Sequence, residues 1–497
     1  MCGIVGYVGS ARACDFVIEG LRKLEYRGYD SAGVATVHEG KLLVQRRKGK
    51  LGALVELLSR EPLAGNVAIG HTRWATHGKP SDENAHPHRV DDVVVVHNGI
   101  IENYMALREE LTARGRRFES ETDTEIIAHL VSLSNAATLT ERVREALTKV
   151  HGTYAIAVIS SREPETIVVA KNASPLVLGV CDGGGMIASD IPALLSHTRE
   201  VVILEEGDIA TVQPGRYTVT KVDGTPVSRP PRTIDWSPVM AEKGGHKHFM
   251  HKEICEQPRA IVDTLRGRIS SDDTDVVLPA EMLELCARTS RILFSACGTS
   301  WHASLVGRLA FEDLARIGCE VEVASELRYR NPLLGEDTLV LAVSQSGETA
   351  DTLASIKEAK RKGSPVLSVV NVLDSSIARE SDHVLYTHAG PEIGVASTKA
   401  FVTQIVALYL LAIGTARRRG LSDTRARELL LGLRQIPLEV SYILEQEPTI
   451  LEVARSILHA RSALFLGRGY GHPVALEGAL KLKEISYIHA EGYAPGE

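Results

Sequence analysis

The first half of the chain alternates short apolar runs with turn residues. Four runs rich in β-branched residues predict strands near 93–101, 153–160, 166–172 and 201–212. Two longer stretches, 13–24 and 124–150, are helical in pattern. Strands with few helices between them pair antiparallel, so this half is predicted to be an α+β domain with mostly antiparallel sheets.

The pattern changes after 228–247, a stretch rich in proline, glycine and polar residues that predicts an interdomain linker. From about residue 248, apolar runs alternate with long helical patterns, which is typical of a parallel α/β sheet. The predicted strands are 291–297, 337–344 and 364–372. The apolar stretch 401–416 is shorter than the ~20 residues of a membrane span and contains Gln404, so we expect a buried helix.

The second half contains an internal repeat. Residues 291–310 and 463–482 share a plan of strand, glycine turn and helix, in which Gly298 and Gly469 align. The first copy has room for a complete α/β domain. The second copy reaches Glu497 well short of the ~100 residues that such a domain needs, so we expect roughly a hundred residues to be missing.

Composition narrows the function classes. The 497 residues carry a net charge of −7, which argues against a general nucleic-acid binder. The seven cysteines form no C-x-x-C pair, and the histidines at 86–88 lack zinc spacing, so neither disulfides nor a metal site is predicted. No basic n-region precedes the first apolar run. We expect a cytoplasmic protein without membrane span, nucleic-acid partner, metal or cofactor.

Candidate chemistry begins at Cys2, directly behind the initiator methionine. A lone cysteine there is compatible with simple core packing. It is also compatible with a nucleophile: removal of Met1 would give Cys2 its own α-amine, which titrates at about 7.7–8.0 and can serve as the base. The choice between the two depends on what the rest of the chain supplies.

A nucleophile that attacks an amide needs an oxyanion hole and a grip on the substrate. Asn98 offers a side-chain amide donor and Gly99 a backbone N–H, although Asn-Gly is also a common hairpin turn. Arg73 could bind a carboxylate in a bidentate geometry. Asp123 can either cap a helix or pair with an ammonium group. Together, Arg73 and Asp123 would recognise a free amino acid.

A second candidate site follows the strand 337–344. SQSGETADT (344–352) brings three hydroxyl groups and a glycine turn to a helix N-terminus, which favours an anion; ordinary helix capping is the alternative. Without a G-K-[ST] signature the segment suits a sugar phosphate better than a nucleoside triphosphate. Glu348 would compete with phosphate unless it points away. Thr299 and Ser300 lie at the neighbouring strand end.

The second copy of the repeat carries three charged residues on one helix face. Glu477, Lys481 and Glu484 have the spacing i, i+4, i+7. A solvated ion pair is the ordinary explanation of such a pattern. A carboxylate within reach of an acidified C–H, acting as a general base, is the other.

The motifs of the first half resemble a known family. They are MCGIVGYVG (1–9), LEYRGYDSAG (24–33), GHTRWATHG (70–78), NAHPH (84–88), HNGIIENY (97–104) and SETDTEIIAHL (120–130). Together they resemble the glutaminase domain of the glutamine–fructose-6-phosphate aminotransferase (isomerizing) family, a class II amidotransferase domain with an N-terminal nucleophile. The resemblance implies that Cys2 is the nucleophile, that Asn98 and Gly99 form the oxyanion hole, and that the glutamine site includes Arg27, Arg73, Trp74, Thr76, His77, His86 and Asp123.

The second half resembles the isomerase part of the same family, which has two sugar-isomerase (SIS) domains. The matching motifs are SACGTS (295–300), SQSGET (344–349), EIGVASTKAF (392–401) and ALEGALKLKEISYIHAE (475–491). The implied fructose 6-phosphate site consists of Thr299, Ser300, Ser344, Gln345, Ser346 and Thr349, with Val395 close by. Glu484 would move the proton between C1 and C2, with Lys481 beside the sugar. The family's ring-opening histidine and Schiff-base lysine would lie beyond Glu497. We therefore expect that the 497 residues of this chain do not complete the sugar step.

The resemblance also implies an organisation and a reaction. The domains would be a glutaminase (2–227), a linker (228–247), a first SIS domain (248–445) and an incomplete second SIS domain (446–497). Glutamine and fructose 6-phosphate would give glutamate and glucosamine 6-phosphate, with ammonia passing internally, in a homodimer. Another class II amidotransferase and a non-enzymatic SIS-type sugar-phosphate sensor are the alternatives. The first would need a pyrophosphate-binding signature, and the second usually carries a DNA-binding module.

Overall fold

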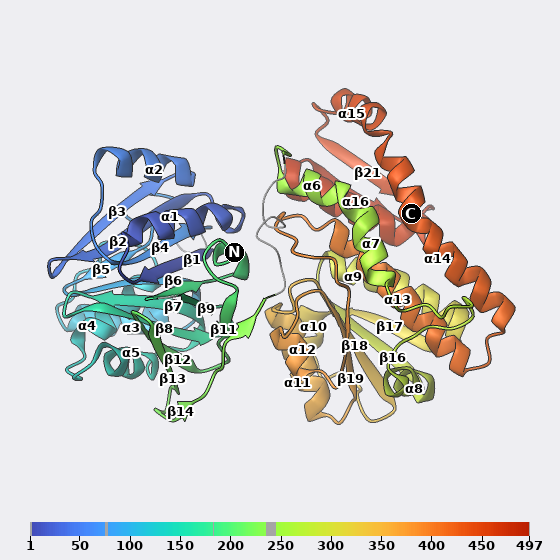
Figure 1. Cartoon of the computed structure of the whole chain (residues 1–497), viewed down its shortest axis with the longest axis horizontal. Coiled ribbons are helices and arrows are strands. Elements are labelled where there is room, and N and C mark those ends of the chain that lie inside the picture. Colours follow the sequence, from blue (N-terminus) through green and yellow to red (C-terminus); the bar gives the residue numbers. More distant parts are fainter. Residues whose placement is uncertain (1, 75–77, 182, 235–244, 497) are drawn as a thin grey trace. The chain divides into compact units, whose positions relative to one another are not determined.

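The chain divides into two structural units, Met1–Glu242 and Lys243–Glu497, each with its own sheets and helices (Figure 1). The computed structural model describes residues 2–74, 78–181, 183–234 and 245–496. Each unit encloses its own clusters of buried apolar side chains.

Two antiparallel sheets form the first unit. Their strands are β1 (Gly3–Val8), β2 (Ser31–His38), β3 (Lys41–Lys48), β4 (Val67–Arg73), β5 (His88–Val90), β6 (Val93–Ile101), β7 (Gly152–Ser160), β8 (Glu163–Asn172), β9 (Val177–Cys181), β10 (Gly184–Ala188), β11 (Glu200–Ile203), β12 (Asp208–Gln213), β13 (Arg216–Lys221), β14 (Pro226–Val227) and β15 (Arg232–Thr233). One sheet has the order β15-β11-β9-β10-β1-β4-β2-β3, and the other has the order β14-β13-β12-β8-β7-β6-β5. Their antiparallel pairing confirms the prediction.

The core of this unit lies between the two sheets. Ile4 of β1, Ile69 of β4, Val94 of β6 and Ile159 of β7 are fully buried in one cluster. The helices of the unit are α1 (Ala13–Lys23), the 3-10 turn η1 (Glu25–Arg27), α2 (Leu51–Arg60), α3 (Tyr104–Ala113), α4 (Thr124–Leu133), α5 (Leu139–Leu147) and the 3-10 turn η2 (Ile191–Ala193). Helix α1 packs on β1 and β4, whereas α4 and α5 cover the second sheet (Figure 1). This layering confirms the predicted α+β class.

Two predicted elements of the first unit are interrupted. The helical stretch 124–150 is two helices, α4 and α5, because Ser134 is extended and Thr138 starts α5 with a capping box. The strand predicted at 201–212 is split into β11 and β12 by a turn in which Gly207 has φ +74°. A positive φ of this kind favours glycine and ends the extended run.

The stretch predicted to be a linker, 228–247, begins as part of the first unit. Its short strand β15 pairs with β11, Val201 facing Arg232. Residues 235–244 of this stretch lie outside the described residues. The remaining residues of the stretch lead into the first helix of the second unit.

A five-stranded parallel sheet is the centre of the second unit. Its strands are β16 (Arg291–Ala296), β17 (Gly318–Val323), β18 (Thr338–Ser344), β19 (Val366–Val370) and β20 (His383–Tyr386), in the order β17-β16-β18-β19-β20. All four pairings are parallel. The three strands predicted in this half are present, and parallel pairing is confirmed.

Helices cover both faces of this sheet (Figure 1). The helices up to residue 418 are α6 (Phe249–Cys255), α7 (Gln257–Leu265), α8 (Ala280–Arg288), α9 (Thr299–Ala310), a π-helical turn (Phe311–Ala315), α10 (Ala324–Tyr329), α11 (Ala350–Arg361), α12 (Ser376–Glu380) and α13 (Lys399–Arg418), of which α7 packs on α13 and not on the sheet. Side chains of α8, α9 and α13 pack on one face, and those of α10, α11 and α12 pack on the other.

Helix α13 is the apolar helix that the sequence predicts to be buried. It is long and apolar enough to cross a membrane, but 83% of its most apolar window is buried inside the unit. Gln404 is among its buried residues and donates from Nε2 to Ser300 Oγ over 2.9 Å. Burial of this extent is typical of a core helix.

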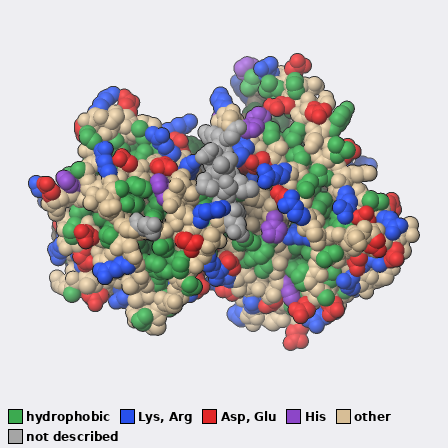
Figure 2. Space-filling view, viewed as in Figure 1, with side chains coloured by type: hydrophobic (Ala, Val, Ile, Leu, Met, Phe, Trp, Pro, Cys, Tyr) green, Lys and Arg blue, Asp and Glu red, His purple; other side chains and the backbone are tan. Residues whose placement is uncertain are grey.

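The chain continues from α13 into α14 (Asp423–Leu444), α15 (Glu447–Ser456), β21 (Ser462–Leu466), α16 (Gly471–Ser486) and β22 (His489–Tyr493). Strands β21 and β22 pair in parallel. The succession β21, glycine turn, α16 has the same plan as β16, glycine turn, α9, as the repeat predicts. This region exposes apolar side chains, among them Leu438, Ile450 and Leu464, and Figure 2 shows apolar atoms gathered around α15.

Candidate active sites

Cys2 lies directly before β1, next to the end of the neighbouring strand β4. Trp74 N–H donates to Cys2 Sγ over 3.2 Å. The Cys2 carbonyl oxygen accepts from Arg27 Nε at 3.1 Å and from Asn98 Nδ2 at 3.0 Å. Cys2 is only partly buried and is absent from the apolar core clusters. Simple core packing therefore does not account for this cysteine.

Burial raises the pKa of the Cys2 thiol, which disfavours the thiolate. The Trp74 N–H and the charge of Arg73 lower the same pKa, and they offset part of the effect. A thiol in this environment needs a base to become nucleophilic. This requirement fits a base on the residue itself.

Arg27 fastens the turn η1 to the start of β1. Besides its bond to the Cys2 carbonyl, its Nη1 forms an ion pair with Asp190 Oδ2 at 2.9 Å. The Arg27 side chain is buried, and Asp190 follows β10. The turn η1, which carries Arg27, is therefore in contact with the main chain of Cys2.

The Asn98 amide has a fixed orientation. Its Oδ1 lies 3.0 Å from His71 Nε2, and its Nδ2 donates to Ser189 Oγ over 2.9 Å as well as to Cys2. Ser189 Oγ also accepts from the Ile4 N–H over 2.7 Å. The side-chain amide predicted for the oxyanion hole thus donates to the main chain of Cys2 and to the Ser189 hydroxyl.

Gly99 lies inside β6, opposite Tyr154, and Asn98-Gly99 is not a hairpin turn. Its φ is +138°, and a Cβ at this position would lie 2.0 Å from the Thr153 carbonyl oxygen. Both features require glycine here. The turn alternative is therefore wrong, and the strand passes the site with a close backbone approach.

Three buried histidines lie beneath Asn98. His71 Nε2 is 3.1 Å from the His97 carbonyl oxygen and 3.2 Å from His86 Nδ1. Burial lowers the pKa of His71 to about 3 and that of His88 to about 3, and it holds the pKa of His86 well below its usual value. These rings are therefore neutral near pH 7. Two oxygen acceptors at His71 Nε2 indicate that this nitrogen carries the proton.

Arg73 and Asp123 are both buried at this end of the first unit. Arg73 Nη2 donates to the Gly78 carbonyl oxygen over 3.1 Å. Asp123 precedes α4 but makes no side-chain cap; its Oδ2 instead accepts from the Ile101 N–H over 2.9 Å. The capping alternative for Asp123 is wrong, while its predicted pairing with a substrate ammonium stays a prediction.

The segment around Trp74 is exposed to solvent. Trp74 is 40% exposed, and its ring lies edge-on to Tyr29 with ring centroids 5.1 Å apart. Thr76 and His77, predicted to bind glutamine, lie outside the described residues. Trp74 therefore contacts Cys2 through its main chain and solvent through its ring.

The second candidate site lies where β18 ends and α11 begins. Ser344 Oγ accepts from the Gly347 N–H over 3.0 Å and lies 3.1 Å from Thr349 Oγ1. Ser346 Oγ accepts from the Glu348 N–H over 3.1 Å. Thr349 is the residue before α11 but makes no side-chain cap. The hydroxyl groups thus gather at the helix N-terminus, where the dipole favours an anion.

Glu348 points away from this cradle. Its two carboxylate oxygens accept from Ser376 N–H and Ser376 Oγ, each over 2.8 Å, at the start of α12. The carboxylate is therefore committed to a neighbouring helix. The competition with phosphate that the sequence raised does not arise in this geometry.

Side chains of α16 reach the start of α9. Thr299 Oγ1 donates to Glu477 Oε1 over 2.9 Å, and Lys481 Nζ donates to Thr299 Oγ1 over 3.0 Å. Lys481 also pairs with Glu484 at 2.7 Å, and His302 Nδ1 lies 2.7 Å from Glu477 Oε2. Glu477 is buried. The charged face of α16 is therefore more than a solvated ion pair, because its side chains join the two copies of the repeat.

Comparison with known proteins divides the chain in the same way. Residues 71–196 match the model of a glutamine amidotransferase domain, and residues 285–414 match the model of a SIS domain. A glutamine–fructose-6-phosphate aminotransferase (isomerizing) of Symbiobacterium thermophilum is 51% identical over all of this chain and 82% of its own length. The protein of the same name from Caldanaerobacter subterraneus is 47% identical over the same shares. The chain belongs to the glutamine–fructose-6-phosphate aminotransferase (isomerizing) family.

A solved structure agrees with this family assignment. The C-terminal domain of glucosamine-fructose-6-phosphate aminotransferase from Francisella tularensis covers 52% of this chain and 72% of its own length, with 42% identity and a TM-score of 0.50. The predicted fold class, an α+β amidotransferase domain followed by α/β SIS architecture, is confirmed.

The structure describes the remaining predicted sugar-phosphate residues but gives no hydrogen bond between them and the hydroxyl groups at the start of α11. Ser300 is buried and its hydroxyl accepts from Gln404, so it faces α13. Gln345 follows Ser344 at the end of β18. Val395 is 68% exposed in the loop before α13. Their roles in binding a sugar phosphate stay predictions.

The structure adds residues that sequence reasoning missed. Ser189 and Asp190 hold Asn98 and Arg27, and His302 and Gln404 hold Glu477 and Ser300. None of these pairs is close in sequence. The one sequence signal near these residues is the family motif around Thr299, which lies close to His302. No motif surrounds Ser189, so the fold alone brings it to Asn98.

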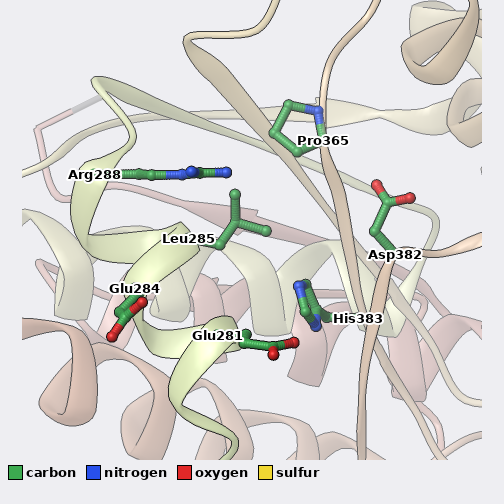
Figure 3. A pocket seen from close by; sticks show the side chains of 7 residues that line it. All are labelled: Glu281, Glu284, Leu285, Arg288, Pro365, Asp382 and His383. Carbon is green, nitrogen blue, oxygen red and sulfur yellow. The ribbon is translucent and has the colours of Figure 1, made fainter.

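A pocket of about 400 Å³ lies away from both candidate sites (Figure 3). It is lined by Glu281 and Arg288 of α8 and by Pro365, Asp382 and His383 at the edge of the sheet. Asp382 is already paired with Lys360 at 3.1 Å. The pocket contains no residue of either candidate site, so it adds nothing to the proposed chemistry.

Proposed function

We propose that the first unit hydrolyses glutamine at Cys2 and that the second unit contributes the phosphate-binding and proton-transfer residues for the conversion of fructose 6-phosphate, with the ammonia, to glucosamine 6-phosphate. Family membership supports this reaction. The observation that carries the residue assignment is the convergence of Arg27, Trp74 and Asn98 on Cys2. The domain assignment, glutaminase to 2–227 and SIS domains to 248–445 and 446–497, belongs to the same proposal.

Glutamine hydrolysis follows from the chemistry of the first site. Once Met1 is removed, the Cys2 amine takes the thiol proton, and the thiolate attacks the side-chain amide carbon of glutamine. Asn98 Nδ2 and the Gly99 N–H stabilise the oxyanion. The proton returns to the leaving nitrogen, ammonia departs, and water hydrolyses the thioester to glutamate. Arg73 would bind the α-carboxylate and Asp123 the α-ammonium.

The sugar step is proposed for the second site. Ser344, Ser346 and Thr349 would bind the phosphate at the N-terminus of α11. Glu484 would move the proton between C1 and C2, a task for a carboxylate beside an acidified C–H. Lys481 lies between Glu484 and Thr299, within 2.7 and 3.0 Å, which supports a position beside the sugar.

The test is to incubate the 497-residue protein with glutamine and fructose 6-phosphate and to measure both glutamate and glucosamine 6-phosphate. Glutamate release that a Cys2-directed alkylating agent abolishes is the expected result for the first half. No glutamate from protein shown by mass to have lost Met1 would overturn the nucleophile assignment. Amino sugar formed by these 497 residues would overturn the expectation that residues required for the sugar step lie beyond Glu497.

Two further properties are inferred, one from family resemblance and the other from composition. We expect a homodimer located in the cytoplasm. Sedimentation equilibrium of the purified protein tests the first, and cell fractionation tests the second. A mass of one chain at all concentrations would contradict the dimer.

A further inference from the structure

One cluster in the second unit has no part in the reaction proposed above. His246 lies just before α6, and His251 and Cys255 lie on that helix, four residues apart. Ligand atoms of these three side chains all lie within 4.8 Å of one another. Residues four apart on a helix share one face, so the helix itself aims His251 and Cys255 at the same point.

The spacing of the two histidines matches that of metal ligands. His246 Nδ1 and His251 Nδ1 are 3.3 Å apart, and the rings are nearly perpendicular, at 81°. Two nitrogens bound tetrahedrally to zinc at about 2.0–2.1 Å are separated by about 3.3–3.4 Å. An ion would therefore fit between the two nitrogens without moving them apart.

A carboxylate lies beside the second nitrogen of His251, at ion-pair distance but without the alignment of a hydrogen bond. His251 Nε2 lies 3.0 Å from Glu447 Oε1, at the start of α15. Metal-binding histidines commonly donate their other N–H to a carboxylate, which fixes the tautomer and the ring orientation. When the ion binds, a small rotation of the Glu447 carboxylate would let it accept the Nε2–H, which leaves His251 Nδ1 unprotonated and directed at the ion.

We propose that His246, His251 and Cys255 bind a transition-metal ion of the zinc class, with Glu447 orienting His251. Two imidazoles and a thiolate favour zinc over magnesium or calcium, which prefer oxygen ligands. Binding displaces the Cys255 thiol proton to solvent. Three protein ligands leave a fourth position for water. The ion would fasten His246, close to the beginning of the second unit, to α6 and, through Glu447, to α15.

Cobalt(II) titration of the whole 497-residue protein tests this site, since cobalt replaces zinc and reports a thiolate ligand by a charge-transfer band in the near ultraviolet. The expected result is one equivalent bound with that band. Cys255→Ser should abolish the band and weaken binding at least about a hundredfold. Glu447→Ala should keep the band and weaken binding about 10–100-fold, the usual cost of losing such a partner.

Two controls distinguish this site from other thiols. Cys319→Ser, at a partly buried cysteine of the same unit, should bind cobalt like the parent protein. A band that persists in Cys255→Ser but disappears in Cys2→Ser would place the metal at the nucleophile and overturn the proposal. Binding that is equal in the parent, His246→Ala and Cys255→Ser proteins would also overturn it. None of these outcomes depends on the proposed sugar chemistry.

Discussion

The two candidate sites differ in the distance along the chain over which they are assembled. Around Cys2, each polar contact joins residues far apart in sequence: Arg27 to Asp190, Asn98 to Ser189. At the anion cradle, Ser344 bonds to Gly347 and Thr349, only three and five residues away. The first site therefore depends on the packing of two whole sheets, whereas the cradle of the second site is largely the property of one strand–helix turn. The contacts of Thr299 with α16, in contrast to the cradle, join residues far apart in sequence.

This difference has energetic consequences. In the first site a side chain such as Asn98 holds two partners and is itself held by His71, so its removal disturbs several groups at once. In the cradle the hydroxyl groups bond mostly to near neighbours, and loss of one leaves the turn in place. Substitutions around Cys2 should therefore lower the glutaminase rate by a larger factor than that by which substitutions at 344–349 lower the affinity for fructose 6-phosphate.

The largest effect is expected for Cys2→Ala. Without its nucleophile the protein should release glutamate at least about 10⁴-fold more slowly, because the thioester cannot form. Initial rates of glutamate release measure the effect. Cys14→Ala, in the buried face of α1, is the matched control and should keep glutaminase activity. More than one per cent residual activity in Cys2→Ala would remove Cys2 from the reaction.

The second effect is expected for Asn98→Ala. Loss of one oxyanion donor costs about 10²–10³ in kcat. Asn98 also anchors the Cys2 carbonyl, so Ser189→Ala, which leaves that bond in place and removes a partner of Asn98 and of the Ile4 N–H, should reduce kcat far less. Steady-state glutaminase kinetics separate kcat from KM. A rise in KM with kcat unchanged would show that Asn98 binds glutamine and does not stabilise the transition state.

The sequence pattern predicted the strands and the fold class, but not the turn and the helix cap that interrupt two of the predicted elements. The strands at 93–101 and 153–160 are present because β-branched runs bounded by turn residues fit a buried sheet. The predicted strand 201–212 is broken by Gly207, whose positive φ the apolar pattern does not reveal. The stretch 124–150 is broken because Thr138 caps a new helix.

The same contrast applies to the sites. The cradle at 344–352 could be predicted because its partners are local. Ser189 and Asp190 could not, because only the pairing of β1 with β10 brings them to Cys2. The expectation that no metal binds rests on the absence of C-x-x-C pairs and on the spacing of the histidines at 86–88. Only His251 and Cys255 share a helix face, and the bend before α6 is what brings His246 to them.

A third expected effect concerns acid stability. Burial lowers the pKa of His88 from 6.5 to about 3, so below pH 6.5 the unfolded chain binds a proton that the folded first unit does not. Stability is therefore lost as the pH falls from 6.5 toward 3, by about 2 kcal/mol at pH 5 for His88. In His88→Gln, the loss between pH 7 and pH 5 should be smaller by that amount.

Urea unfolding followed by hydrogen exchange in peptides of the first unit measures this difference without interference from the second. His38→Gln is the control, since His38 is exposed and its substitution should leave the pH dependence unchanged. Equal pH dependence in the parent and His88→Gln proteins would mean that His88 is protonated in the folded state.

The smallest effect is expected at the cradle. Thr349→Val keeps the shape of the side chain and removes one hydroxyl, so affinity for fructose 6-phosphate should fall about tenfold, the cost of a hydrogen bond to a charged group. Thr352→Val, one turn into α11 and buried, is the control and should bind like the parent. Titration calorimetry measures both.

Because Ser344 still accepts from Gly347 in the variant, the turn should persist and glutaminase activity should not change. If Thr349→Val instead abolished binding altogether, the cradle would be as cooperative as the network around Cys2, and the difference between a locally and a globally assembled site would not hold.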